Sequence, residues 1–441
     1  MHIAIAAPSL TGRLNSTFEL VSRLENEGHE VTYLCSADIA PKVLKQGFEY
    51  VEIPTINFNF KDPNRKELSS WFSKFKFHFK NLSKHYANGK KILHLDEYKR
   101  IIVELNPDRV VVDVELHDLI FSAIAAKIPV ALFHTWFSDT ISINSPSIRT
   151  NIIPGQNFSG SKMGILWSWI LMRLKINGRV VLNKLTFNNY RRSVFKKYAR
   201  EIGFDTSGLL VNTLPPLFSF TKLPILTTVM SEFEFPHKFG KNIKYLGPMV
   251  YSQRVDKTAE SDDEKRLGQI LKLKNFEQKK LIYCSVGSLA KGNLSFLKRV
   301  VEAVAENNEW VLVMSIGPKM DLESFTDLPP NAHIFKWVPQ LKVIEESDCA
   351  ITHCGINSIN ECIHFKVPML LYSGGYTDED GNAARMAYHG IGIRGNKDLD
   401  DSTIIKMNIS RILNESSFKD NIANMNDIYK EYCERAITPF L

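Results

Sequence analysis

Residues 350–365 indicate the fold most clearly and read Ala-Ile-Thr-His-Cys-Gly-Ile-Asn-Ser-Ile-Asn-Glu-Cys-Ile-His-Phe. The apolar run at 350–352 predicts a buried strand, and residues 357–365 have the apolar spacing of a helix. His353 and Gly355 lie in the turn between them. A strand that turns directly into a helix leaves free backbone N–H groups at the positive end of the helix dipole. The sequence therefore predicts an anion site at this turn.

Strands and helices alternate along the chain on both sides of this turn. The chain begins with an apolar strand at 2–6, and Ser16, followed by Glu19, predicts the cap of a helix that ends at Gly28. Further strands are expected at 31–34, 110–113, 129–133, 281–286, 310–316, 333–337 and 369–372, and further helices near 295–306 and 382–389. The alternation is typical of a parallel α/β fold. Two doubly wound domains that face each other would place a ligand cleft between the carboxyl ends of their strands.

The length of 441 residues exceeds what one hydrophobic core usually organises, so two domains are expected. Residues 252–265 are polar, rich in charge and without an apolar period. We therefore predict an N-terminal domain over 1–250, a linker over 251–265 and a C-terminal domain over 266–415.

The composition excludes several classes of protein. With 44% hydrophobic and 23% charged residues, the chain is not disordered as a whole. It has no run of about eighteen uncharged apolar residues and no basic start, so we expect neither a membrane span nor a secretory signal. The six cysteines have no framework spacing, which fits a reducing compartment and predicts a cytoplasmic protein.

The positive charge is concentrated in two segments of the first half. Residues 60–100 hold 11 Lys and Arg against 4 Asp and Glu, and residues 161–200 hold 10 against none. Both segments are interleaved with aromatic residues. Three interpretations are open. The segments are solvated helix faces, or they contact the anionic inner surface of the membrane, or they form a lid over a hydrophobic acceptor. We expect no nucleic acid as a partner, because no stacking module or reading helix accompanies the charge.

The residues around the predicted turn suit a nucleotide with a diphosphate. Trp337 offers a flat face for a base, Gln340 offers an amide, and Glu361 can accept hydrogen bonds from a ribose diol. Ser358 adds a hydroxyl and His353 a ring donor beside the free amides. Further polar candidates are Ser288 for the diphosphate and Asp378 and Glu379 for the hydroxyls of a hexose.

The segment 337–384 strongly resembles the donor-binding signature of the family 1 UDP-glycosyltransferases, which have the GT-B fold of two facing Rossmann-like domains. Segments 28–32, 232–236, 245–248 and 285–288 share the resemblance, whereas the middle of the first domain shares it poorly. The resemblance implies a first domain that binds the acceptor, a second that binds the UDP-sugar, and a final helix within 416–441 that crosses back to the first domain.

By this resemblance, each site residue has an expected role. Trp337, next to Val338, would stack on uracil, and Gln340 and Glu361 would hold the ribose, which favours UDP over a deoxyribose carrier. The diphosphate would be held by Ser288, His353, Gly355, Asn357 and Ser358, and the sugar by Asp378, Glu379 and, as a weaker candidate, Thr135. The family inverts the anomeric centre without a metal or other cofactor, so we expect transfer of a hexose, with UDP-glucose as the donor, to a small hydrophobic or lipidic acceptor.

The sequence departs from the family where the catalytic base is expected. Arg13 stands in place of the family's histidine, and arginine cannot deprotonate a hydroxyl near neutral pH. The family's orienting aspartate corresponds to Asp113. Either the acceptor is already anionic and Arg13 positions it, or Asp113, His117 or His134 is the base, or the protein is a non-catalytic auxiliary that only binds the nucleotide sugar.

A UDP-sugar epimerase, which shares the fold, is a second enzyme hypothesis for this sequence. Glu379 stands where the family usually has Gln, and its charge disfavours a uronic acid donor. Cysteines and histidines near 349–364 have no paired C-x-x-C spacing, so we expect no metal site.

Overall fold

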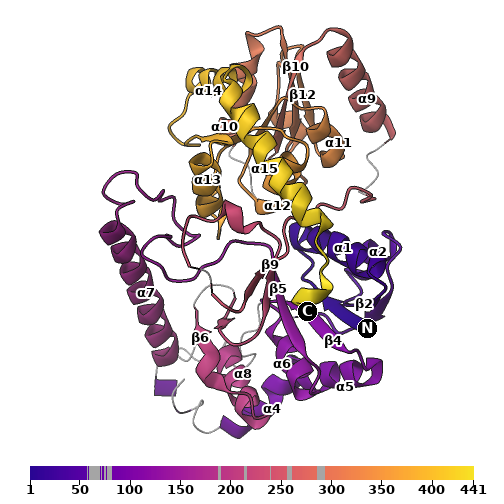
Figure 1. Cartoon of the computed structure of the whole chain (residues 1–441), viewed down its shortest axis with the longest axis vertical. Helices are drawn as coiled ribbons and strands as arrows, with labels where there is room; N and C mark the ends of the chain where they lie inside the picture. The colour runs from indigo at the N-terminus through magenta and orange to yellow at the C-terminus, as the bar shows by residue number, and fades with distance from the viewer. Residues whose placement is uncertain are drawn as a thin grey trace.

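Two parallel sheets, one in each half of the chain, form the framework of the molecule (Figure 1). The computed structural model describes residues 1–56, 58, 70, 72–73, 76, 82–186, 190–212, 216–238, 240–255, 261–285 and 294–441. Much of the basic segment 60–100, including its aromatic residues at 71, 75, 77 and 79, therefore lies outside the described residues.

The first sheet has seven parallel strands in the order β3-β2-β1-β4-β5-β8-β9. Its strands are β1 His2–Ala6, β2 Glu30–Cys35, β3 Tyr50–Glu52, β4 Arg109–Asp113, β5 Val130–His134, β8 Ile225–Thr227 and β9 Ile243–Tyr245. The helices of this half are α1 Thr11–Asn26, α2 Ala40–Leu44, α4 Leu82–Ile92, α5 Leu95–Leu105, α6 His117–Ala125, α7 Lys162–Leu185 and α8 Tyr190–Glu201. A short antiparallel pair, β6 Leu209–Val211 with β7 Phe218–Phe220, lies beside them.

The second sheet has six parallel strands in the order β12-β11-β10-β13-β14-β15. Its strands are β10 Lys280–Ser285, β11 Trp310–Ser315, β12 Ala332–Phe335, β13 Cys349–Thr352, β14 Met369–Leu371 and β15 Gly392–Arg394. The helices are α9 Ser261–Phe276, α10 Leu294–Ala305, α11 Gln340–Glu345, α12 Ile356–His364, α13 Glu379–Tyr388, α14 Ser402–Asn414 and α15 Ser416–Glu434. Helix α9 begins at Ser261, so the last residues assigned to the linker from sequence are helical.

Both sheets are buried on both faces, as parallel sheets require. In β1, Ile3 and Ile5 pack in one apolar cluster with α1, whereas Ala4 and Ala6 pack in another with α5 and α6. The strand order reverses beside β1 and again beside β10. Helices α1 and α12 follow strands at these two positions, so the segments that precede them lie where ligands bind in doubly wound folds.

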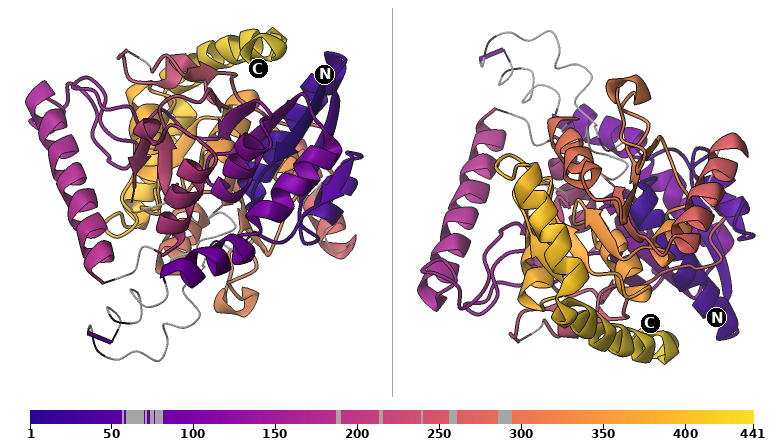
Figure 2. Two further views of the ribbon diagram at one scale, coloured as in Figure 1. Left: turned by 90° about the horizontal axis from the view of Figure 1, so that it is seen from below. Right: turned by 90° about the horizontal axis from the view of Figure 1, so that it is seen from above.

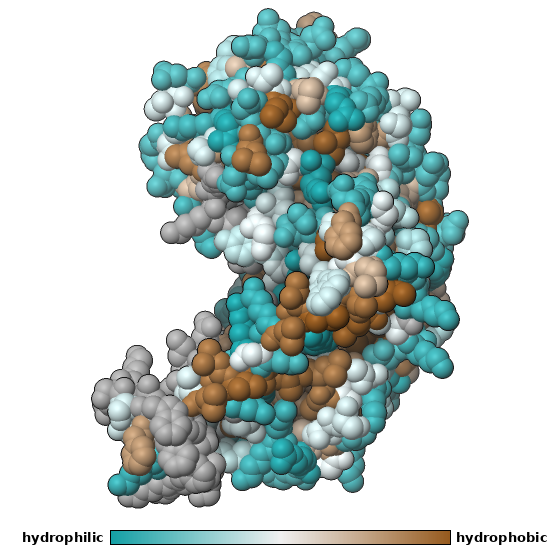
Figure 3. All heavy atoms as spheres, turned by 90° about the vertical axis from the view of Figure 1, so that its left-hand side faces the viewer, coloured by the Kyte–Doolittle hydropathy of each residue, from teal (hydrophilic) through white to brown (hydrophobic). Residues whose placement is uncertain are grey.

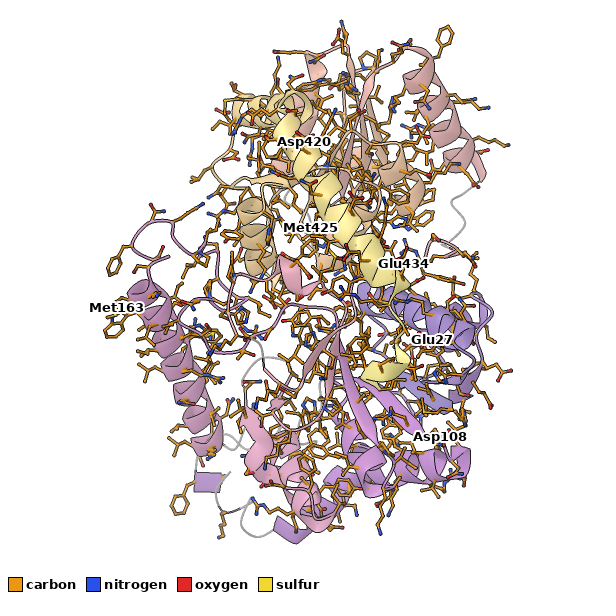
Figure 4. All side chains as sticks on the ribbon, in the orientation of Figure 1. Glu27, Asp108, Met163, Asp420, Met425 and Glu434 are labelled. Atoms are coloured by element: carbon orange, nitrogen blue, oxygen red, sulfur yellow. The ribbon has the colours of Figure 1, made fainter. Side chains whose placement is uncertain are left out.

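The C-terminal helix α15 runs from the second half back to the first (Figures 1 and 4). Figure 4 shows Asp420 over the second half, whereas Glu434 lies close to Glu27, the residue that follows α1. The Glu27 carboxylate accepts hydrogen bonds from the backbone N–H groups of Ile437, at 2.6 Å, and Thr438, at 2.9 Å. These contacts fasten the end of the chain to the first half.

A buried ion pair also joins the halves. Arg385 of α13 donates from Nε and Nη2 to Oε2 of Glu234, at 3.1 and 3.0 Å, and neither side chain is exposed. Its guanidinium group lies 4.7 Å from the ring centroids of both Phe137 and Phe235. The other carboxylate oxygen, Oε1, accepts from Tyr245 Oη at 3.1 Å. The pair is thus fully desolvated between elements of both halves.

The predicted start of the first helix is wrong. Helix α1 begins at Thr11, and Leu10 is its N-cap residue, so Ser16 lies within the helix. Ser16 Oγ instead contacts the backbone carbonyl of Gly12 and the side chain of Asn357 in the second half. Ser16 therefore does not cap the helix but contacts Asn357, a residue far along the chain that no local pattern reveals.

Candidate functional site

The turn between β13 and α12 has the features of an anion site. Gly355 is the N-cap residue of α12 with extended backbone, and as a glycine it has no side chain to accept from the first-turn N–H groups. A Cβ atom on Gly355 would lie 2.6 Å from Nε2 of His353, so only glycine leaves room for this ring. The turn therefore presents free amides and an imidazole at the positive end of a helix dipole.

His353 is held neutral and has spare hydrogen-bonding capacity. Burial, with help from the charge of Lys397, lowers the pKa of His353 to about 4. Its Nδ1 atom is buried and has no hydrogen-bond partner among the residues that the structure describes. A buried polar atom without a partner is costly, and a ligand that accepts or donates there would remove that cost. Lys397 was not predicted from the sequence, because it lies after β15 and outside the signature segment 337–384.

A polar cluster lies beside this turn. Gln340, the first residue of α11, donates from Nε2 to Ser358 Oγ at 3.2 Å and to Glu361 Oε2 at 2.5 Å. Glu361 Oε1 accepts from Arg254 Nη1 at 3.0 Å. The structure thus brings together Gln340, Ser358 and Glu361, three of the residues predicted near the ribose and diphosphate, and it adds Arg254. Arg254 was assigned to the predicted linker, and a single arginine in a charge-rich segment carries no local signal of a binding role.

Trp337 and Val338, the two residues predicted beside the uracil, differ in exposure. Trp337, which follows β12, is half-buried, so part of its indole is available for stacking. Val338 is 3% exposed and packs in the apolar core, so its side chain contributes to the fold.

Asn357 connects the anion turn to the first half of the chain. Its Nδ2 donates to the carbonyl of Gly12 at 2.5 Å, and its Oδ1 accepts from Ser16 Oγ at 2.7 Å. A Cβ atom on Gly12 would lie 2.8 Å from Nδ2 of Asn357. Since Arg13 follows Gly12 directly, the contact brings the Arg13 position up to the N-terminus of α12.

Asp378 and Glu379 lie at the start of α13. Asn382 Nδ2 donates to Asp378 Oδ2 at 2.8 Å and to the carbonyl of Cys354 at 2.9 Å, so it ties α13 to the anion turn. Glu379 Oε2 accepts from the backbone N–H of Gly374 at 2.7 Å. Burial raises the pKa of Glu379 to about 7. In this structure, the Glu379 carboxylate therefore binds the backbone of the loop that precedes α13.

Arg13 is held between two carboxylates. Its Nη1 atom lies 3.2 Å from Asp113 Oδ1 and its Nη2 atom 2.8 Å from Glu115 Oε1. The guanidinium group also lies 4.8 Å from the ring centroid of Trp136. Burial disfavours the charge of Arg13, but Asp113 and Glu115 outweigh that effect and raise the pKa of Arg13. Arg13 therefore stays a cation, and it cannot act as a base.

The nearby groups differ in their fitness as a base. His117 Nε2 accepts from the N–H of Phe218 at 3.2 Å, its Nδ1 lies 2.9 Å from the carbonyl oxygen of Glu115, and burial lowers its pKa to about 4. His134 stacks on Trp136 with a centroid distance of 5.0 Å, and burial lowers its pKa to about 3. Both histidines therefore pack as neutral, buried rings.

The two carboxylates remain. Asp113 is fully buried, and burial, opposed by Arg13, raises its pKa to about 6. Its Oδ2 atom has no hydrogen-bond partner in the described part of the chain. The side chain of Glu115 is 13% exposed. Glu115 was not singled out from the sequence, although it lies two residues after the strand that ends at Asp113.

The remaining candidates are placed as follows. Thr135 is 4% exposed and follows β5 directly. Ser288 lies outside the described residues. Over the described ranges, no group of three or more His, Cys, Asp and Glu side chains is arranged to hold a metal ion.

Comparison with known proteins agrees with this geometry. The family model described as UDP-glucoronosyl and UDP-glucosyl transferase matches residues 13–439. The chain belongs to this family. It is thus a glycosyltransferase that uses a nucleotide sugar, as the signature segment predicted.

Individual relatives cover different parts of the transferase. It is 22% identical over 431 residues to the NDP-glycosyltransferase YjiC of Bacillus subtilis, which spans 98% of this chain and 93% of YjiC. It is 30% identical over 194 residues to the uncharacterized UDP-glucosyltransferase YdhE of the same organism, which spans 44% of this chain and 46% of YdhE. This second match thus takes in about half the length of that relative.

A solved structure shows the same fold. The glycotransferase of kitacinnamycin aligns with a TM-score of 0.69 at 20% identity and covers 98% of this transferase and 95% of that chain. The GT-B prediction of two facing Rossmann-like halves is confirmed.

Proposed function

We propose that this transferase moves a hexose, with inversion and without a metal, from UDP-glucose to a small hydrophobic or lipidic acceptor. The single observation that carries the proposal is the contact between Asn357 and Gly12. It brings the N-terminus of α12, an anion site, next to Arg13 and its two carboxylates. A donor diphosphate and an acceptor hydroxyl could therefore meet at the interface between the halves.

On the donor side, Trp337 would stack on the uracil, and Gln340 with Glu361 would bind the ribose. The close contact of these last two side chains supports a shared role. The amides at the start of α12 and the ring of His353 would bind the diphosphate. Because these groups and Lys397 supply positive potential, a departing UDP would be stabilised without a metal ion.

On the acceptor side, we assign the base to Glu115. Its carboxylate would take the proton of the acceptor hydroxyl while the oxygen attacks the anomeric carbon. The bond from that carbon to the diphosphate oxygen breaks, and its electron pair leaves with UDP. Arg13 would hold Glu115 in place, and Asp113 would orient Arg13. The larger exposure of Glu115 and the burial of Asp113, His117 and His134 support this assignment.

Transfer is tested by incubating the protein and UDP-glucose with phenolic, polyketide and lipid acceptors in the presence of EDTA. We expect a glucoside whose anomeric configuration, read by NMR, is opposite to that of the donor, at a rate that EDTA does not change. Tight UDP-glucose binding with neither transfer nor hydrolysis would instead support a non-catalytic auxiliary. Conversion of the sugar without an acceptor would indicate an epimerase, and loss of activity with EDTA would contradict metal independence.

A further inference from the structure

Helix α7 extends along the outside of the first half, away from the second sheet (Figures 1 and 2). Its residues Gly164, Ile165 and Trp169 are buried. Trp169 Nε1 donates to the carbonyl of Ser145 at 3.0 Å, and Ser161 Oγ accepts from the N–H of Gly164 at 3.1 Å. The helix is thus anchored and capped at its start, whereas most of its length faces outward.

The outward face of α7 is apolar. Nine large apolar side chains on it are at least 36% exposed, namely Met163, Leu166, Trp167, Ile170, Leu171, Leu174, Val181, Leu182 and Leu185. They recur every three or four residues for most of the helix, so they form one stripe. Figure 3, which views the molecule from the α7 side, shows a continuous hydrophobic band there. A soluble protein rarely exposes so long an apolar surface unless it meets a partner.

Basic residues flank this apolar stripe. Helix α7 contains five Lys and Arg residues and no Asp or Glu. At about 3.6 residues per turn, Lys175 and Arg179 fall on one side of the stripe, and Lys162, Arg173 and Lys184 fall on the other. Long basic side chains at the margins of an apolar stripe can reach lipid headgroups while the stripe enters the acyl region.

The helix is not suited to cross a membrane. Within the described parts of the chain, no helix is both long enough and apolar enough to do so. Its five Lys and Arg side chains would be costly in the bilayer centre. The favourable arrangement is therefore a helix that lies in the plane of the membrane surface.

The charge also distinguishes lipid from a second copy of the chain. Two copies of α7 packed face to face would bring ten cations together with no acidic partner on either helix. Like charges that face each other across a protein interface repel, which disfavours this pairing. An anionic bilayer supplies both the apolar layer and the opposite charge.

We propose that α7 docks the protein on the surface of anionic membranes, with its apolar stripe in the interface and its Lys and Arg side chains on the headgroups. This proposal is independent of the transferase reaction. It does not require a lipid as the acceptor, because the docking face and the donor site lie on different elements.

The test is sedimentation of the full chain with vesicles of phosphatidylcholine alone and of phosphatidylcholine with phosphatidylglycerol. We expect binding to the anionic vesicles that falls at least about tenfold between 50 mM and 500 mM NaCl. The substitution Leu174→Glu should reduce binding at low salt by about tenfold or more, because it places a like charge on the stripe. The matched control is Leu399→Glu, a leucine that is 77% exposed in the second half, and it should bind as the natural chain does.

Several outcomes would overturn the proposal. Absence of binding, equal binding to both kinds of vesicle, or equal loss in both variants would each contradict docking through α7. A dimer by light scattering that Leu174→Glu converts to monomer, without vesicle binding, would show that the stripe covers a second copy. Transfer to a soluble phenol is measured in parallel, so a failure of docking is separable from a failure of the proposed reaction.

Discussion

We expect the substitution Arg385→Met to lower the free energy of unfolding by about 3–5 kcal/mol. Glu234 accepts two of the three hydrogen bonds from this guanidinium group, and neither side chain is exposed. Loss of Arg385 would leave the Glu234 carboxylate buried without its counter-charge, and that cost exceeds the net value of the pair. The loss should appear in urea unfolding followed by both circular dichroism and tryptophan fluorescence.

Two comparisons make this experiment decisive. Arg411→Met removes a partner of the exposed Arg411–Glu415 pair, whose side chains are 46% and 43% exposed, and should cost at most about 1 kcal/mol. The double variant Arg385→Met with Glu234→Leu should recover part of the loss, because no unpaired buried charge remains. Equal effects of Arg385→Met and Arg411→Met would contradict the role of the buried pair in joining the halves.

The substitution Glu115→Gln should lower kcat by about 10²–10⁴-fold and leave the KM for UDP-glucose nearly unchanged. The amide keeps the shape of the side chain but cannot accept the proton of the acceptor. An acidic acceptor such as 4-nitrophenol should lose less rate than an ordinary phenol, because its hydroxyl needs less help from a base. Initial rates over a series of substituted phenols measure this difference.

The controls separate Glu115 from its neighbours. Glu104→Gln, at an exposed carboxylate on α5, should leave the rates unchanged. If Asp113→Asn abolished transfer while Glu115→Gln did not, the base would be Asp113. In that case the acceptor would have to reach a carboxylate that is fully buried in this structure.

Local patterns in the sequence were sufficient for most strands of the two sheets and for the turn before α12, but they did not predict the short strands β3, β8, β9 and β15. The predicted strand at 2–6 matches β1, and the helix predicted at 357–365 differs from α12 by one residue at each end. Apolar period and turn residues act over a few positions, so a single sequence reveals them. The turn at His353 and Gly355 could therefore be predicted from the sequence, whereas its partners in other segments could not.

The contacts between the halves could not be found this way. The pair of Arg385 with Glu234 and the pair of Arg254 with Glu361 each join segments that are more than a hundred residues apart. Glu234 and Arg254 also lie outside the signature segment 337–384. Ser16 shows the limit of a local rule, because the capping pattern fits its neighbours while its partner is Asn357. No local pattern marks Glu115, which lies two residues after the family position at Asp113, and only the structure shows that both carboxylates contact Arg13.

The most direct test of the donor site is calorimetric titration of UDP into the natural chain and into His353→Ala. We expect the variant to bind UDP about 5–150-fold more weakly, which corresponds to about 1–3 kcal/mol of lost charge-assisted hydrogen bonding. His364→Ala is the matched control, because His364 ends the same helix and contacts Tyr429 instead of the turn. Unchanged affinity in His353→Ala, or an equal loss in His364→Ala, would contradict a diphosphate site at the N-terminus of α12.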